Sequence, residues 1–235
     1  DVGTTAVAGM IGPARHLAGK QGVFCGEQIA NFPVGASSHS TEAWLRAEKS
    51  NGRALAWGNE HGQGKVVMHF MSPPHVKMEC YFSGADVASL GRLPMNEWIH
   101  IMHTYQQGDS RIYVNGELSN VSKTPNSPLA IKTPARFYIG GWYNNYDFVG
   151  DIDEVRISKV VRSPHWVKLQ HENQKTMQTL FGPVVQSGNS FVVSPTSATV
   201  PEGKKATFTV QAGGAQKIYW ILKSDGQENI AAVDR

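Results

Sequence analysis

The feature that most constrains this chain is the alternation of apolar and polar residues, which recurs from end to end. In KVVMHF (65–70) and VKMECYF (76–82), every second side chain is apolar. Successive side chains of a β-strand point to opposite faces, so a period of two predicts half-buried strands. The SPPH turn between the two segments predicts a hairpin. The chain is therefore expected to be all-β.

Further strands follow the same pattern. WIHIMHTY (98–105) and SRIYVNGEL (110–118) form an expected antiparallel pair, and Asn115-Gly116 suits a tight primed turn. RFYIGGW (136–142) and DIDEVRIS (151–158) come next.

One helix is expected, in RSPHWVKLQHENQ (162–174). Ser163 can cap it, Pro164 suits its first position, and Trp166 and Leu169 share one face. It should cover one side or end of a β-sandwich.

Composition excludes several partners. The 24 Gly and 12 Pro favour many turns, and the net charge of +3 forms no basic stripe, so nucleic acid is not an expected partner. No apolar run approaches the ~20 residues that cross a bilayer, so membrane insertion is not expected. The missing initiator Met suggests a piece of a longer protein. Cys25 and Cys80 permit at most one disulfide, and buried thiols remain the alternative.

Three segments carry a resemblance to a known family. STEAWLRAE (40–48), NEWIHIMHTYQQGDSRIYVNGEL (96–118) and FVGDIDEVRISKVVRSPHWVKLQHENQ (148–174) resemble the laminin-G-like, concanavalin A-like jelly rolls of secreted bacterial polysaccharide-degrading proteins. The resemblance implies a sandwich of two antiparallel sheets. It also implies a secreted or cell-surface module, usually non-catalytic, that binds glycans or acts as a spacer.

The residue pattern of the sequence changes after Phe181. VSPTSATVPEGKKATFTVQA followed by IYWILKSDG resembles the first strands of an immunoglobulin-like domain, with Trp220 as its core tryptophan. Only about half of the ~100 residues of such a domain are present. We therefore predict a jelly-roll domain at residues 1–182 and an incomplete immunoglobulin-like segment at residues 183–235, with neighbouring domains of the same polypeptide as partners.

The acids of DIDEVRIS raise the question of catalysis. Strict alternation places Asp151 and Asp153 on one face and Glu154 with Arg156 on the other. Retaining glycosidases need two carboxylates about 5–5.5 Å apart, and laminarinase-type jelly rolls supply them as Glu-x-Asp-x-Glu. The pattern Asp-Ile-Asp-Glu departs from that motif, so no catalytic residue is predicted.

The same acids raise the question of a metal. Jelly rolls of this kind frequently hold one calcium ion, and the resemblance makes Asp151 and Asp153 its candidate ligands. The structural alternative is that Glu154 pairs with Arg156 while an aspartate accepts backbone N–H bonds.

The loop WYNNYD (142–147) has the chemistry of a sugar-binding lip. Sugars stack on aromatic rings and are oriented by convergent hydrogen bonds. The candidate ligand-binding residues of this loop are Trp142, Tyr143, Asn144, Asn145, Tyr146 and Asp147. The alternative is a plain turn in which Gly140-Gly141 adopts positive φ and the tryptophan covers the edge of the core.

A second loop, WGNEHGQG (57–64), matches by position the first ligand loop of the pentraxins, which belong to the same superfamily. Its candidate ligand-binding residues are Trp57, Asn59, Glu60 and His61. The 142–147 loop is shorter than its pentraxin counterpart and lacks the run of acidic ligands, so no double calcium site is predicted. His100 and His103 fall on opposite faces of their strand and so do not make a ready metal pair, and solvent-facing polar histidines are the expected alternative.

The leading hypothesis is a non-catalytic carbohydrate-binding module of a larger secreted or surface-displayed bacterial protein, itself a glycan-active enzyme or adhesin, with polysaccharide as the partner. A structural or adhesive spacer that packs on a neighbouring domain is the first alternative. A glycoside hydrolase or lyase domain is the second.

Overall fold

A computed structural model of the 235-residue chain describes all residues except 144, 176–190, 213–217, 225–226 and 235. The chain divides into two compact units, Asp1–Gln174 and Lys175–Arg235. Each unit is described by itself. The domain boundary predicted at 182/183 lies outside the described residues.

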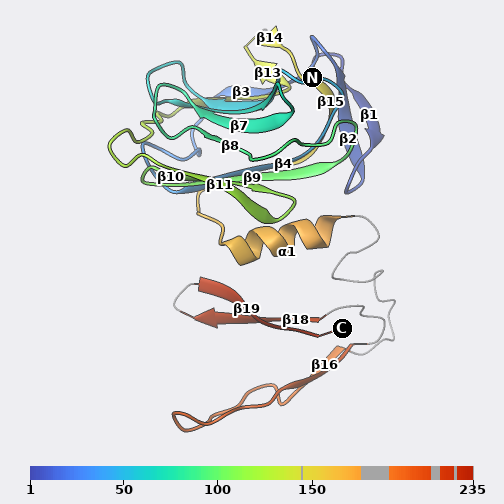
Figure 1. Ribbon diagram of the computed structural model, residues 1–235, viewed down its shortest axis with the longest axis vertical. Helices are drawn as coiled ribbons and strands as arrows, with labels where there is room; N and C mark the ends of the chain where they lie inside the picture. The colour runs from blue at the N-terminus through green and yellow to red at the C-terminus, as the bar shows by residue number, and fades with distance from the viewer. Residues whose placement is uncertain (144, 176–190, 213–217, 225–226, 235) are drawn as a thin grey trace. The chain divides into compact units, whose positions relative to one another are not determined.

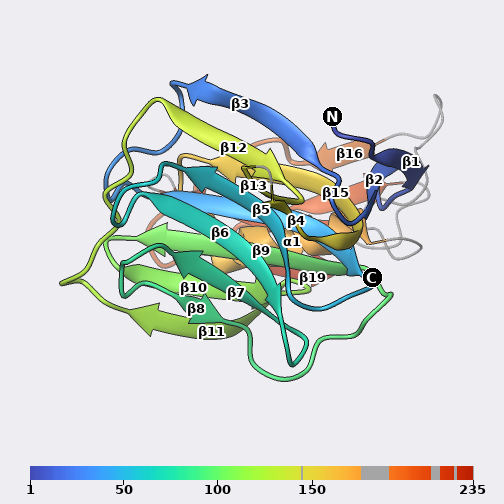
Figure 2. The ribbon, with the colours of Figure 1, turned by 90° about the horizontal axis from the view of Figure 1, so that it is seen from above.

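The first unit is a sandwich of two antiparallel sheets (Figure 1). The seven-stranded sheet has, in spatial order, β1 (Thr5–Ala8), β2 (Pro13–Ala18), β15 (Val149–Ser158), β4 (His39–Ala47), β9 (Ile99–Gln106), β10 (Asp109–Val114) and β11 (Glu117–Lys123). The six-stranded sheet has β3 (Val23–Ile29), β12 (Ala135–Ile139), β5 (Gly52–Gly58), β6 (Lys65–Met71), β7 (His75–Cys80) and β8 (Val87–Ala88) (Figure 2). Neighbours far apart in sequence, such as β15 and β4, show that the chain crosses repeatedly between sheets, as in a jelly roll. The all-β prediction is confirmed.

The core lies between the two sheets and follows the alternation. Val66, Met68 and Phe70 of β6 are fully buried, as are Val76 and Met78 of the adjacent β7. Each such side chain contributes about 1.5–3 kcal/mol through burial. The predicted hairpins β6–β7 and β9–β10 are both present.

The turn at Asn115-Gly116 and the two cysteines are placed as follows. Asn115 and Gly116, between β10 and β11, have φ of 49° and 82°, the positive values that a type I′ turn requires. Cys80 is buried and Cys25 is exposed, and both are free thiols. Burial raises the pKa of the Cys80 thiol, which makes it unreactive.

The predicted helix is α1 (Pro164–Gln174), which packs on the outer face of the seven-stranded sheet (Figure 1). Ser163 Oγ accepts a hydrogen bond from Trp166 N at 3.2 Å and so caps the helix. Val167 is buried against Met102 of β9. Within the described part of the chain, no helix has the length and apolar character needed to span a bilayer.

A β-bulge in β15 changes the expected orientation of its acids. The pairing of β15 with β4 shifts register between Asp153 and Arg156, and Glu154 has a φ of 51°. Ile152 points into the core before the bulge, and Val155 packs against the core after it. Glu154 and Arg156 therefore share the outer face with Asp153, and the prediction that Glu154 lies on the opposite face is wrong.

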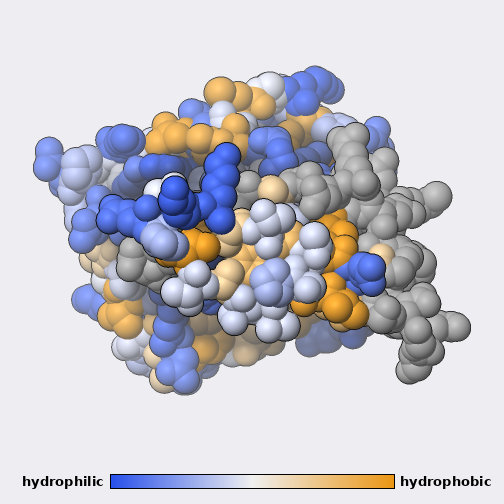
Figure 3. Space-filling model, turned by 90° about the horizontal axis from the view of Figure 1, so that it is seen from below, coloured by the Kyte–Doolittle hydropathy of each residue, from blue (hydrophilic) through white to orange (hydrophobic). Residues whose placement is uncertain are grey.

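The second unit contains two hairpins among its described residues, β16 (Phe191–Ser194) with β17 (Thr209–Ala212) and β18 (Ile218–Ser224) with β19 (Gln227–Asp234). Trp220 is partly buried. Large apolar side chains such as Phe191 and Leu222 are exposed, and hydrophobic surface is visible in Figure 3. Two hairpins do not establish an immunoglobulin sandwich, so that part of the resemblance stays a prediction.

Candidate aromatic binding surface

The outer face of the six-stranded sheet carries a seat for an aromatic ring. Strand register aligns Val67 of β6, Ala56 of β5, Tyr138 of β12 and Phe24 of β3 across four strands. Their side chains point away from the core, because the residues between them point inward. The side chains of Ala56 and Val67 are small, and the ring of Trp142 packs on them.

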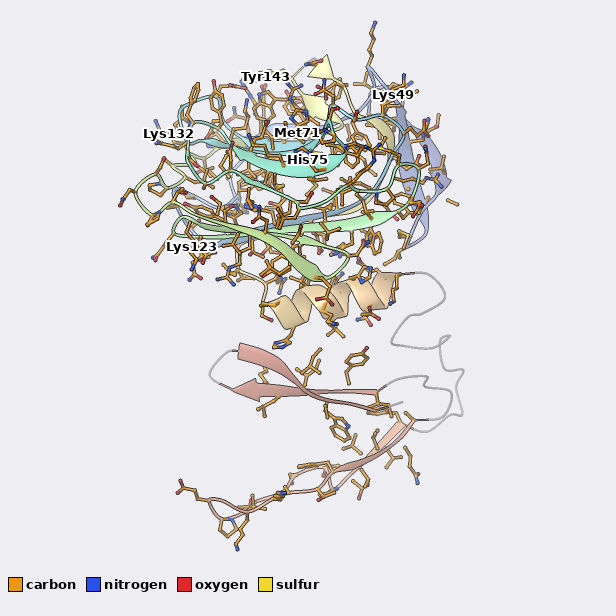
Figure 4. All side chains as sticks on the ribbon, viewed as in Figure 1. Lys49, Met71, His75, Lys123, Lys132 and Tyr143 are labelled. Atoms are coloured by element: carbon orange, nitrogen blue, oxygen red, sulfur yellow. The ribbon has the colours of Figure 1, made fainter. Side chains whose placement is uncertain are left out.

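The hairpin of β13 (Gly141–Trp142) and β14 (Asn145–Tyr146) supplies this tryptophan. Trp142 is only 7% exposed and meets Tyr138 edge-on, with ring centroids 5.2 Å apart. Tyr143 follows it at the turn, on the side of the unit away from α1 (Figure 4). The hairpin thus lies over the sheet, and its next ring, Tyr143, is partly buried against Trp142.

A second row of residues flanks this seat. Lys65 Nζ lies 4.3 Å from the ring centroid of Tyr81 and 5.1 Å from that of Trp142. At the other end, Arg136 Cζ lies 4.5 Å from the ring centroid of Tyr143. Cations at these distances are attracted to the ring faces. Rings and cations therefore form one continuous row of contacts, in which Trp142 is itself buried.

Phe82 extends this surface into solvent. Its ring centroid lies 4.1 Å from that of Tyr81, and its side chain is 75% exposed. Phe82 and Tyr143 have φ of 58° and 53°, values that bulky residues rarely adopt. Such backbone strain concentrates at ligand-binding positions. We call the following set the aromatic strip: Phe82, Tyr81, Lys65, Trp142, Tyr143 and Arg136.

Glu60 joins the predicted second loop to this strip. One of its carboxylate oxygens, Oε1, accepts hydrogen bonds from Trp142 Nε1 and from Lys65 Nζ, the latter at 3.3 Å. The Lys65 side chain is only 13% exposed. The 57–64 loop therefore contacts the 142–147 loop through Glu60.

The other predicted residues of the second loop lie elsewhere. Asn59 binds the backbone of Pro134 and Lys132, and His61 Nε2 lies 2.7 Å from the carbonyl oxygen of Ala130. These two side chains brace a neighbouring segment. Trp57 is fully buried in the core, where its Nε1 donates to Thr41 Oγ1 at 3.1 Å. The prediction of Trp57 as a ligand-binding residue is wrong, because β5 turns its ring inward.

The remaining residues of the 142–147 loop have separate roles. Asn145 is exposed and Tyr146 is partly buried, with its ring 6.3 Å from that of Tyr138. Asp147 accepts a hydrogen bond from Arg53 N at 2.7 Å and forms an ion pair with the Arg53 guanidinium. It therefore anchors the loop to β5. Asn144 lies outside the described residues.

Four members of the strip were not among the predicted residues: Phe82, Tyr81, Lys65 and Arg136. Alternation places Lys65 and Tyr81 on the solvent face of their strands, opposite the apolar residues. That signal was present in the sequence. Which outward-facing residues become neighbours depends on strand register, which alternation does not supply.

The two predicted metal ligands lie on the outer face of the other, seven-stranded sheet. Asp153 Oδ2 accepts hydrogen bonds from Met10 N at 2.8 Å and Ile11 N at 3.1 Å, and its Oδ1 accepts one from Glu154 N at 2.8 Å. Calcium takes six to eight oxygen ligands. The N–H groups around Asp153 therefore fit the structural alternative, an aspartate that holds a backbone turn, and do not fit a calcium site.

Asp151 has nitrogen partners as well. Its Oδ1 lies 2.8 Å from His16 Nδ1, and its Oδ2 lies 2.5 Å from Arg46 Nε. Glu154, the third acid, pairs with Arg156. Asp151 and Glu154 are thus paired with arginine side chains and Asp153 with backbone N–H groups, and these three acids offer no free pair to a substrate across the distance that glycoside hydrolysis requires.

Comparisons with known proteins agree with this architecture. A family model described as the concanavalin A-like lectin/glucanases superfamily matches residues 21–168. Domain 4 of AbnA, a GH43 extracellular arabinanase from Geobacillus stearothermophilus solved with arabinotriose, is 20% identical, with a TM-score of 0.56 over 70% of this chain and 79% of that one. The CBM40 of the Ruminococcus gnavus IT-sialidase, bound to alpha2,3 sialyllactose, is 13% identical, with a TM-score of 0.54 over 67% of this chain and 96% of that one.

A third similar structure is the native heptameric SAP-like pentraxin from Limulus polyphemus, at 12% identity and a TM-score of 0.53 over 70% of this chain and 83% of that one. At these identities the likeness shows the fold alone. No curated protein matches the chain.

Proposed function

The chain belongs to the concanavalin A-like lectin/glucanase superfamily, and from this premise we propose that its first unit binds carbohydrate through the aromatic strip. The observation that carries the proposal is the continuity of the strip, which includes two aromatic side chains in strained backbone conformations, the exposed Phe82 and the partly buried Tyr143. The bound arabinotriose and sialyllactose of two similar structures support a glycan as the ligand class.

The strip offers the two interactions that sugars need. The faces of Phe82 and Tyr143 suit the C–H faces of a sugar ring, whereas the buried Trp142 serves as their foundation. Asn145 and Glu60 are exposed and supply hydrogen-bonding groups at the rim. We further propose that the module is non-catalytic and that its parent is a larger secreted or surface-displayed bacterial protein that acts on polysaccharide.

The proposal is tested by removing the rings of Phe82 and Tyr143. We expect Phe82→Ala and Tyr143→Ala each to weaken polysaccharide binding at least about fivefold, as for an interface residue worth ~1 kcal/mol. The measurement is retardation in affinity gels over a panel of polysaccharides. Phe191→Ala is the matched control, because Phe191 of the second unit is 71% exposed and lies outside the strip.

The melting temperature of Phe82→Ala should stay close to that of the parent chain, since exposed substitutions change stability little. Trp142→Ala does not separate binding from folding, because it removes a buried ring beneath the hairpin and so leaves a cavity that destabilises the fold. The proposal would be wrong if both single variants and the double variant were retarded by the polysaccharide as strongly as the parent chain. Absence of retardation by every polysaccharide would favour the spacer alternative.

The charges around the strip indicate which glycans to expect. Lys65 pairs with Glu60 at 3.3 Å, and Arg136 pairs with Glu27 at 3.6 Å. A cation that is already paired with a carboxylate attracts the negative charge of a uronate or sulfate only weakly. We therefore expect retardation by neutral polysaccharides that is insensitive to added salt. Retardation confined to acidic polymers and abolished by salt would contradict this expectation.

A further inference from the structure

Three side chains converge on the outer face of the seven-stranded sheet, away from the aromatic strip. They are His16 of β2, Asp151 of β15 and Glu48, which directly follows β4. Their ligand atoms all lie within 4.8 Å of one another. We propose that they bind a zinc-type divalent ion.

The distances between the donor atoms suit such an ion. His16 Nδ1 lies 2.8 Å from Asp151 Oδ1 and 3.8 Å from Glu48 Oε1. Donors of a tetrahedral zinc site lie ~3.3 Å apart, given metal–ligand bonds of about 2.0–2.2 Å. The two observed separations bracket this value, and the third, between Glu48 and Asp151, is at most 4.8 Å. Metal binding therefore requires the Glu48 carboxylate to move toward Asp151 and the ring proton of His16 to be absent from Nδ1.

The three donors are held differently. The Asp151 side chain is 1% exposed, and Arg46 binds its Oδ2 at 2.5 Å, which leaves Oδ1 directed at His16. The Arg46 guanidinium is itself placed over the ring of Trp98, at 5.2 Å. Arg46 is thus an outer partner that orients a metal ligand, as second-shell groups do.

Glu48 combines an anchored backbone with an adjustable side chain. Its N–H donates to Val149 O at 3.0 Å, which fixes it beside β15, while its side chain is 43% exposed and can swing toward His16. Solvent access to His16, whose side chain is 28% exposed, leaves a coordination position open to water.

The donor set decides the kind of ion. Calcium and magnesium prefer sites made of oxygen atoms, whereas imidazole nitrogen with carboxylates suits zinc and its first-row neighbours. An ion here would tie β2 to β15 and to the end of β4. Binding to the folded chain alone stabilises it by mass action, so the melting temperature should rise with metal concentration.

The test uses the full chain after chelator treatment and dialysis. Titration calorimetry with Zn²⁺ should give one site, and Co²⁺ should give the visible absorption bands of a bound ion. Glu48→Gln should weaken Zn²⁺ binding by at least about tenfold, and His16→Ala should abolish it. Ca²⁺ should produce no comparable heat.

Histidines elsewhere in the chain need a control. His69→Ala removes a partly buried histidine whose Nδ1 lies 3.4 Å from Glu79 on the other sheet, and it should leave Zn²⁺ affinity unchanged. Unchanged Zn²⁺ binding in both His16→Ala and Glu48→Gln, or no saturable Zn²⁺ binding by the parent chain, would overturn the proposal. If His16→Ala fails to fold, the exposed Glu48→Gln variant decides alone.

Discussion

Acidification from pH 6.5 to about pH 4 is expected to lower the free energy of unfolding of the first unit by roughly 3 kcal/mol through His39 alone. His39 is fully buried between the sheets, with its ring 5.1 Å from that of Trp57 and 5.0 Å from that of Tyr105. Burial lowers its pKa from 6.5 to about 4, and a hydrogen bond to the Ser37 carbonyl opposes this only in part.

The loss of stability on acidification follows from the protons that the chain takes up when it unfolds. The unfolded chain protonates His39 near pH 6.5, whereas the folded chain resists protonation until about pH 4. Stability is therefore complete above pH 6.5 and is lost as the pH falls toward 4. His103, also fully buried, adds to the loss, because burial and the neighbouring His39 lower its pKa as well.

Denaturant titrations across this pH interval measure the effect. In His39→Phe the ring shape is kept and the proton site is removed, so the pH dependence should shrink while the contribution of His103 remains. The difference from the parent chain at neutral pH isolates the cost of repacking. An identical pH dependence in parent and variant would contradict the assignment to His39.

Asp153→Ala is expected to cost about 2–4 kcal/mol of stability. The carboxylate accepts hydrogen bonds from Met10 N, Ile11 N and Glu154 N, and its residue is only 7% exposed. Hydrogen bonds to a charged group contribute about 1.5–3 kcal/mol each and are not additive, and donors left unpaired add a penalty. Asp153→Asn should lose less, because its amide oxygen still accepts two of the three bonds.

Thermal and denaturant unfolding with and without chelator separate this role from a calcium ligand. Chelator should leave the parent chain and the variants unchanged when calcium is the only divalent ion present, since the partners of Asp153 are N–H groups. Asp109→Ala is the control, because its pair with Arg111 is partly exposed and should contribute less than about 1 kcal/mol. A chelator effect equal to that of Asp153→Ala would restore the calcium interpretation.

The strands and core were predictable because they depend on local alternation. The alternation predicts a buried face that includes Val66, Met68 and Val76, and all three are buried in the structure. Trp57 carried the same signal, since it shares a face with Leu55, but the glycines that follow suggested a loop. The tryptophan belongs to the strand, and the loop begins after it.

The features that were missed depend on contacts distant in sequence. The bulge at Glu154 arises where β15 pairs with β4, more than a hundred residues earlier. His100 and His103 do lie on opposite faces, but both are buried, one near α1 and one between the sheets. Alternation cannot reveal that a helix covers the outer face of a strand.

The register that seats Trp142 has an evolutionary consequence. Along β6, Val66 and Met68 belong to the core, whereas Lys65 belongs to the aromatic strip and Val67 packs beneath Trp142. Under the proposed function, fold stability and ligand binding therefore depend on alternate residues of one strand. Related chains that diverge in ligand should vary here with a period of two, so that specificity changes by small steps without disturbing the interior.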